Sequence, residues 1–274
     1  MKRILVPTDF SEHAEHALKV AAQIARKNNS EIIILHMLEL PHQSNDAIFG
    51  GVSIPETMLF MQKANETLDK VSNSDFLDGI PVTEIVKMDK PIHGITQVSK
   101  EQDVDLIVMG SHGSTGIDEL LIGSNTEKVV RNSDIPVLII KKEIPNFEIK
   151  NIVFASDFSE ETKKPFQKLL KFTKSFDAKL HLVTICTPNS FKPTHIINKA
   201  VKEFTDDFNL TNFETHIYND TNIEKGILNF SNSINADAIG MCTHGRTGFA
   251  HFFNGSISEG LVNHAIRPVI TLKI

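Results

Sequence analysis

The sequence predicts two α/β domains in series, each built around a doubly wound parallel sheet. Short apolar runs alternate with longer stretches of helical period, which indicates that strands alternate with helices. Runs such as "EIIILHM" and "DLIVMG" are almost continuously apolar, as expected for parallel strands covered on both faces. This order of elements occurs twice, and right-handed crossovers between its strands give the doubly wound topology.

The first copy is expected to contain five strands and four helices. Residues 3–7 are a short apolar run, and residues 12–28 then carry alanine and leucine at helical spacing. The apolar strand 31–38 follows, and a loop leads to a helix near 56–72. The same alternation predicts strand 82–87, helix 92–102, strand 105–110, helix 125–132 and strand 136–141. In the second copy, helices are expected near 160–175, 194–208, 222–235 and 256–265.

The repeat is visible in the residues themselves. "ILVPTDFSEHAEHALKVA" aligns with "IVFASDFSEETKKPFQKL" at an offset of 148, and later matches fall at an offset of 132. The first copy therefore has 16 extra residues, expected within 39–55, as either a lid or an ordinary surface insertion. A period of this length indicates duplicated domains, at 1–143 and 149–274, joined by "KKEIPNFEIK".

Bulk composition excludes several classes of protein. The 274 residues are 41% hydrophobic, enough to fill the cores of two soluble globular domains. A net charge of -6 argues against broad nucleic-acid binding, which needs a basic face. There is no apolar run of membrane-span length, no signal-peptide pattern at the start, and only two cysteines. A cytoplasmic protein without membrane or nucleic-acid partners is expected.

Two motifs fall where a doubly wound sheet binds ligands, outside the carboxyl ends of the first and fourth strands. "PTDFS" places Asp9 after the first strand, either as a ligand group or as a cap for the next helix. "GSHGSTG" follows the fourth strand, where Gly110 and Gly113 are expected to permit positive φ and close approach of a ligand.

A second pair of motif residues precedes the next helix. Gly123 and Ser124 come before "NTEKVVRN", where free amides at the helix start favour an anion such as phosphate. The Ser124 and Thr126 hydroxyls would either donate to phosphate or cap the helix. Spaced glycines by themselves are more typical of a plain loop, because neither GxxxxGK[ST] nor a GxGxxG opening the first helix is present.

The spacing Gly110-x2-Gly113-x9-Gly123-Ser124, together with "PTDFS" and "SDIPVLIIK", resembles the universal stress protein family, specifically its ATP-binding branch. The match spans both halves, so the chain resembles a tandem member. The resemblance implies Rossmann-like domains with five-stranded parallel sheets in the order 3-2-1-4-5 and pairing of the domains through their last strands. It also implies ATP, with or without Mg²⁺, in the crevice.

The resemblance assigns roles by position. Pro7, Met37 and Met109 would line the adenine pocket, Asp9 would meet the ribose or phosphates, and the glycine segments would contact ribose and phosphates. The implied nucleotide-binding residues are Pro7, Thr8, Asp9, Met37, Met109, Gly110, His112, Gly113, Gly123, Ser124, Asn125 and Thr126. His112 is also a candidate acid or base, or a residue that positions the loop.

The second copy departs from the pattern, with Cys242 in place of Gly110 and Ala155 in place of Pro7. A side chain at Cys242 is expected to fill space where the backbone should meet the nucleotide, so this domain should bind more weakly or not at all. Its degenerate site would comprise Asp157, Ile185, Cys242, Gly245, Gly255, Ser256 and Ser258.

Other candidate sites have plainer explanations. Cys186, Cys242 and His244 could bind zinc, but buried free thiols are the favoured interpretation. His13 and His16 are expected on a solvated helix face.

No catalytic set is recognisable, so ATP hydrolysis should be slow at most. The expected function is that of a stress-response protein in which ATP acts as a switch. The alternatives are an ATP-hydrolysing or adenylating enzyme and a nucleotide-free scaffold. A homodimer is a further candidate assembly.

Overall fold

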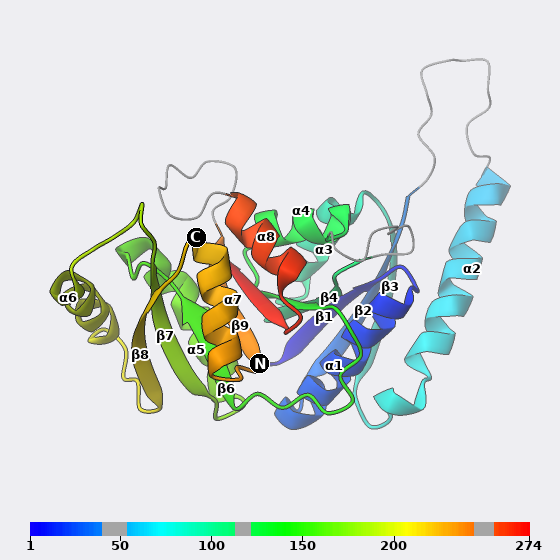
Figure 1. The fold of residues 1–274 in the computed structure, drawn as a ribbon. Helices are drawn as coiled ribbons and strands as arrows, with labels where there is room; N and C mark the ends of the chain where they lie inside the picture. The colour runs from blue at the N-terminus through cyan, green and yellow to red at the C-terminus, as the bar shows by residue number, and fades with distance from the viewer. Residues whose placement is uncertain (40–53, 113–121, 244–254) are drawn as a thin grey trace, which may run out of the picture.

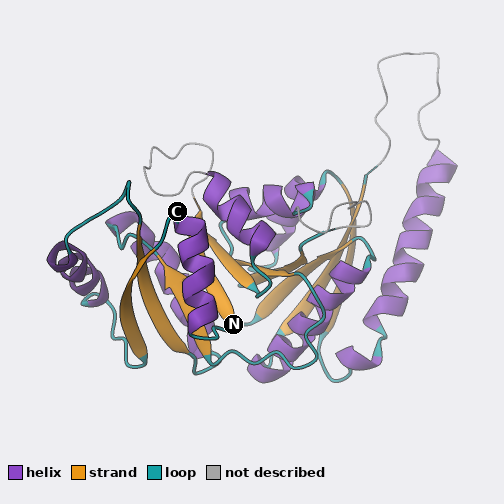
Figure 2. Ribbon diagram, in the orientation of Figure 1, coloured by secondary structure: helices purple, strands orange, loops and turns teal. Residues whose placement is uncertain are grey.

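The chain forms a ten-stranded sheet with helices on both faces (Figures 1 and 2). The computed structural model describes residues 1–39, 54–112, 122–243 and 255–274. The strand order is β3-β2-β1-β4-β5-β10-β9-β6-β7-β8. Each half therefore has the predicted order 3-2-1-4-5, and the predicted α/β class with two tandem domains is confirmed.

The first half follows the predicted alternation of elements closely. Its strands are β1 (Arg3–Thr8), β2 (Glu31–Leu38), β3 (Val82–Met88), β4 (Leu106–Gly110) and β5 (Val137–Ile140). Its helices are α1 (Glu12–Asn28), α2 (Ile54–Ser72), α3 (Pro91–Glu101) and α4 (Ser124–Asn132), with a 3-10 turn at Asp75–Leu77.

The second half repeats this order. Its strands are β6 (Asn151–Ala155), β7 (Lys179–Cys186), β8 (Phe213–Asn219), β9 (Ala238–Thr243) and β10 (Val269–Lys273). Its helices are α5 (Lys163–Lys174), α6 (Thr194–Thr205), α7 (Ile223–Ser233) and α8 (Gly255–His264). A short 3-10 helix, Glu160–Thr162, precedes α5, so the long helix begins later than its counterpart α1.

Two apolar layers hold the helices to the sheet. Alternate strand residues point to opposite faces, and both faces are buried, as expected of parallel strands. Helices α1, α2, α5 and α6 bury side chains in one layer, and α3, α4, α7 and α8 bury theirs in the other.

Helix α1 is bounded by clear stop and start signals. Ser11 caps its amino end by accepting a hydrogen bond from the Ala14 amide, at 3.3 Å. Asn29 closes its carboxyl end in the left-handed region, with φ of 52°. The helix therefore starts directly after the turn that carries Asp9.

Part of the extra length of the first copy lies in a helix. Helix α2 has 19 residues, whereas its counterpart α6 has 12. The expectation that all the extra residues fall within 39–55 is therefore wrong in part, because helical periodicity continues through α2. Most of that segment, including the proposed lid, lies outside the described residues.

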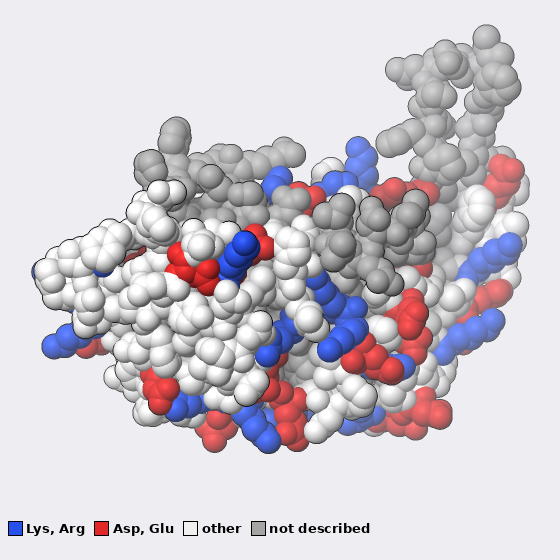
Figure 3. Space-filling view, in the orientation of Figure 1, with Lys and Arg blue, Asp and Glu red and all other residues white. Residues whose placement is uncertain are grey.

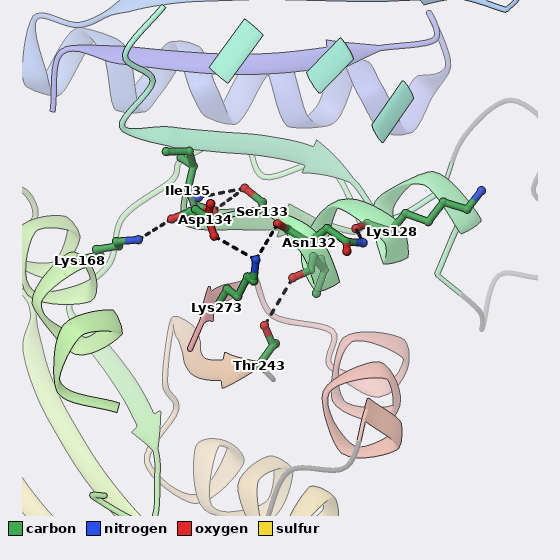
Figure 4. Close-up of polar contacts among 9 residues, drawn as sticks. Lys128, Asn132, Ser133, Asp134, Ile135, Lys168, Thr243 and Lys273 are labelled. Atoms are coloured by element: carbon green, nitrogen blue, oxygen red, sulfur yellow. Dashed lines mark hydrogen bonds and ion pairs between the residues drawn. The ribbon is translucent and has the colours of Figure 1, made fainter. Parts of the chain in front are cut away.

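The two halves join edge to edge. Strand β5 pairs antiparallel with β10, so that Leu138 lies opposite Ile270. Polar contacts reinforce the junction (Figure 4): the Lys273 ammonium lies 3.0 Å from the Asp134 carboxylate, and the Lys168 ammonium donates to the Asp134 carbonyl at 2.5 Å. The hydrogen bond from Lys273 lowers the pKa of Asp134.

The described surface does not concentrate one sign of charge in the view of Figure 3, where basic and acidic side chains are interspersed. Among the helices of the described residues, none has the length and hydropathy needed to cross a membrane.

Candidate functional site

The predicted site residues of the first domain lie where three parallel strands end. Pro7 and Thr8 are the last residues of β1, Met37 lies near the end of β2, and Met109 and Gly110 end β4. Strand β1 pairs with β2 on one side and with β4 on the other. Since the strands are parallel, their carboxyl ends form one edge of the sheet.

Asp9 lies exposed in a turn at this edge. The Thr8 hydroxyl accepts from the Phe10 amide at 3.0 Å, and an Asp9 carboxylate oxygen accepts from the Ser11 amide at 3.1 Å. Phe10 adopts a φ of 64°, which reverses the chain into α1. The cap of α1 is Ser11 rather than Asp9, so the exposed carboxylate organises the turn that precedes the helix.

The amino end of α4 is bound to the end of β4 by two hydrogen bonds. The Gly123 amide donates to the Ser111 carbonyl at 2.7 Å, and the buried Thr126 hydroxyl donates to the Gly110 carbonyl at 2.9 Å. Thr126 thus has a partner inside the protein. Gly123 occupies the N-cap position without a side-chain cap, and Ser124 and Asn125 are exposed. Within the part of the chain that the structure describes, no side chain therefore caps the first-turn amides.

Gly110 is required by packing inside the protein, which corrects the reason expected from the sequence. Its φ is not in the left-handed region, and it ends a buried strand. A Cβ on Gly110 would lie 2.7 Å from the backbone carbon and oxygen of His13. Glycine at this position lets α1 pack directly against β4.

The histidines of α1 are not on a solvated face, so that expectation is wrong. The His16 side chain is 12% exposed, and the His13 ring lies 5.3 Å from the His112 ring. Helix α1 packs against β4, and the His13 backbone lies against Gly110 at the end of that strand. His112 Nδ1 lies 2.8 Å from the Ser111 hydroxyl, so this ring is held at the loop start.

One site residue was missed in the sequence. A Cβ on Gly94 in α3 would lie 2.2 Å from the methyl carbon of Met37, so the Met37 side chain crosses the helix at this glycine. In the second domain, a Cβ on Gly226 would likewise lie 2.4 Å from a methyl carbon of Ile185. The sequence did contain a signal for this residue. Gly94 in α3 and Gly226 in α7 lie at equivalent positions of the two copies, at the same offset of 132.

The second domain reproduces part of this arrangement. Asp157 accepts from the Ser159 amide at 3.1 Å, and Phe158 has a φ of 58°, as in the first domain. Gly255, Ser256 and Ser258 lie in the first turn of α8. A mainly apolar pocket at the ends of β6 and β7 is lined by Asp157, Ile185 and residues of α6. Gly113, Gly245 and His244 lie outside the described residues.

Both cysteines are buried free thiols. Cys186 ends β7 and Cys242 lies in β9, with β6 between these strands. Burial, with the nearby Asp157 carboxylate, raises the pKa of Cys242 well above its usual range. A protonated thiol is a poor metal ligand. Contacts between α5 and β9 are few, so Cys242 has room that Gly110 lacks.

The second domain contacts the loop of the first site through Asn263 of α8. The Asn263 side-chain oxygen accepts from the Ile122 amide at 2.6 Å, next to Gly123. The Asn263 carbonyl accepts from the Lys141 ammonium. Burial of Lys141 lowers the pKa of its ammonium group. Asn263 itself is 8% exposed, so this contact is shielded from water.

Replacing Asn263 with leucine should leave the Ile122 amide without its acceptor. We expect a loss of about 1–3 kcal/mol in the free energy of unfolding and faster hydrogen exchange at Ile122. Urea unfolding and amide exchange read by mass spectrometry measure both effects. Asn229→Leu, which removes an exposed contact with Asp220, is the control. Equal effects of the two variants would show that Asn263 does not hold the loop.

Comparisons with known proteins agree with this architecture. The model of the universal stress protein family matches the chain twice, over residues 1–141 and 148–273. Universal stress protein MJ0577 of Methanocaldococcus jannaschii is 34% identical over 155 residues, covering 52% of this chain and 96% of that protein.

Two further relatives match over the whole length. Universal stress protein Slr1230 of Synechocystis is 24% identical over 292 residues and covers 100% of both chains. A crystal structure of a universal stress protein from Archaeoglobus fulgidus shares the fold, with a TM-score of 0.77 at 24% identity, covering 99% of this chain and 98% of that one. With the family model matching both halves, this chain belongs to the universal stress protein family and carries two family domains in tandem.

Proposed function

We propose that the N-terminal domain binds ATP at the carboxyl ends of β1, β2 and β4, and that binding regulates a stress response. The observation that carries this proposal is the start of α4. Its glycine N-cap has no side chain to cap the first-turn amides, no other described residue caps them, and two hydrogen bonds hold them beside the end of β4. Oriented amides at a helix start favour phosphate oxygens.

The remaining groups suit the other parts of a nucleotide. Asp9 is exposed at the same edge of the sheet, where its carboxylate would accept from ribose hydroxyls. Met37 and Met109 offer apolar surface for an adenine ring. Met37 contributes through its position against Gly94 in α3.

The second domain is proposed to bind nucleotide more weakly and to act mainly as a structural partner. The support for this role is its junction with the first domain, through β5 and β10 and through the Asn263 contact at the loop of the first site. ATP would then act as a switch if one arrangement of that loop binds it more tightly than another.

The test is nucleotide binding by the untagged full-length protein. Nucleotide released on denaturation would be identified by mass spectrometry, and ATP affinity would be measured by calorimetry with and without Mg²⁺. Asp9→Ala should weaken binding about 10-fold or more, because a hydrogen bond to a charged group is lost. Gly123→Val should weaken it further by crowding the phosphate end.

Asp157→Ala is the matched control, because Asp157 holds the equivalent turn in the second domain. It should leave the affinity of the N-terminal site unchanged. Wild-type protein that neither carries nor binds an adenine nucleotide would overturn the proposal. Rapid, sustained phosphate release would instead support the enzyme alternative.

A further inference from the structure

A group of metal-ligand side chains lies in the second domain, away from the nucleotide crevice. His181 is near the start of β7, Glu214 is near the start of β8, and His216 is in the middle of β8. The strand register places His181 directly opposite Glu214, and His216 lies two residues along on the same face. Asp157 and the apolar pocket lie at the other, carboxyl end of the strands.

The three ligand atoms form a compact triangle. His181 Nδ1 lies 3.2 Å from His216 Nε2, and Glu214 Oε2 lies 3.7 Å from each nitrogen. Neighbouring ligand atoms in a tetrahedral zinc site lie about 3.4 Å apart when the bonds are about 2.0–2.1 Å long. The triangle therefore has nearly the size of one face of such a tetrahedron. Small movements of the three side chains would bring their ligand atoms to the distances of a zinc site.

A hydrogen bond from Nε2 of His181 leaves its Nδ1 available as a metal ligand. His181 Nε2 lies 3.1 Å from the Asn151 amide oxygen, which can only accept. A proton on Nε2 leaves the Nδ1 lone pair directed toward His216. Outer hydrogen bonds of this kind usually orient metal-bound histidines.

Neighbouring side chains orient Glu214 and His216. The Lys179 ammonium donates to Glu214 Oε1 at 2.5 Å, so Oε2 remains toward the rings. Phe230 of α7 packs over His216 at 4.8 Å.

The group is open on one side. The side chain of His181 is 7% exposed, that of His216 is 26% exposed and that of Glu214 is 49% exposed. Solvent therefore reaches the group past Glu214, which is the route for an ion and the source of a water as fourth ligand. Three protein ligands and a water are a common zinc coordination set.

The fold itself does not require these polar residues. In the first domain the positions of His181, Glu214 and His216 are occupied by Ile33, Thr83 and Ile85, in the same strand register. Ile33 and Ile85 thus occupy the histidine positions in the equivalent pair of strands. A specific role for the polar set is therefore expected.

We propose that His181, Glu214 and His216 bind one Zn²⁺ ion, with water as the fourth ligand and Asn151 orienting His181. The ion links the edge strand β8 to β7, because its ligands come from both strands. The inference is independent of nucleotide binding, because it uses neither domain's crevice.

The test uses untagged full-length protein stripped of metal. Zinc affinity and stoichiometry would be measured in competition with a coloured chelator, and Co²⁺ would report tetrahedral coordination through its visible absorption. His216→Ile, which introduces the residue found at the equivalent position of the first domain, should remove one bound zinc and the Co²⁺ spectrum. Asn151→Ala should weaken zinc binding about 10- to 100-fold, as expected for an outer hydrogen-bond partner.

Two further variants make the result decisive. Glu214→Gln changes an exposed side chain without altering its size, so it should fold and still lose zinc affinity. His264→Ala removes a surface pair in which His264 Nδ1 lies 2.6 Å from Glu224, and it should leave zinc binding unchanged. Circular dichroism would verify folding. Failure of the wild type to bind zinc, or equal binding by wild type, His216→Ile and Glu214→Gln, would overturn the proposal.

Discussion

Replacing Gly110 with alanine should destabilise the first domain by about 3 kcal/mol, at the upper end of the usual cost of overpacking. The added Cβ would lie 2.7 Å from two backbone atoms of His13, and a helix backbone cannot rotate away as a side chain can. Helix α1 must therefore move from β4. Urea unfolding followed by circular dichroism gives the change in the free energy of unfolding.

The same variant should weaken ATP binding, because the turn holding Asp9 leads directly into α1. Cys242→Ala is the matched control at the equivalent position of the second domain, where a side chain already fits. It should cost about 1 kcal/mol through the loss of a small buried group. Equal effects of the two variants would show that contact with the α1 backbone is not why glycine is needed.

Replacing Phe166 with alanine should destabilise the second domain by about 3–5 kcal/mol, the usual cost of deleting a buried phenylalanine. Phe166 is 0% exposed. Its ring lies 4.9 Å from that of Phe154, 5.0 Å from that of Phe204 and 4.9 Å from that of Phe208. Alanine would leave a cavity among several aromatic rings. Urea unfolding again measures the loss.

The exposed Phe191 supplies the control, because it is 74% exposed and its truncation should change stability little. Phe166→Leu, which introduces the residue found at position 18 of the first copy, should cost less than alanine. A loss from Phe166→Ala no greater than that from Phe191→Ala would contradict the packing argument.

This variant also tests how the domains depend on each other. Strands β5 and β10 join the halves in a continuous sheet, and Asn263 contacts the loop of the first site. If the second domain is a structural partner, Phe166→Ala should lower ATP affinity as well as stability. Unchanged ATP affinity in the destabilised variant would show that the first domain functions alone.

The fold was predictable because its signals are local. Apolar periodicity located the strands and helices: the expected helix 12–28 is α1, and the expected strand 31–38 is β2. The internal repeat supplied the two-domain organisation. Helix α5 was less predictable, since the motif that starts α1 leads into a 3-10 helix in the second copy.

The sequence predicted that the strand ends and the start of the next helix lie together, but not how the residues there are packed. The glycine spacing predicted that Gly110 and Gly123 belong to one site. The structure places the end of β4 beside the start of α4. Which groups surround each glycine depends on helix packing. The spacing therefore could not reveal that His13 lies against Gly110, or that Gly94 makes room for Met37.

The sequence by itself determined the class of fold, its duplication and its family, because periodicity, repeats and motif spacing are properties of neighbouring residues. Tertiary structure alone decided which distant side chains meet. His181 and Glu214 are far apart in the chain and share no motif, yet the parallel register of β7 and β8 places them opposite each other beside His216. Strand register depends on how whole elements pack, so this group could be found only in the folded protein.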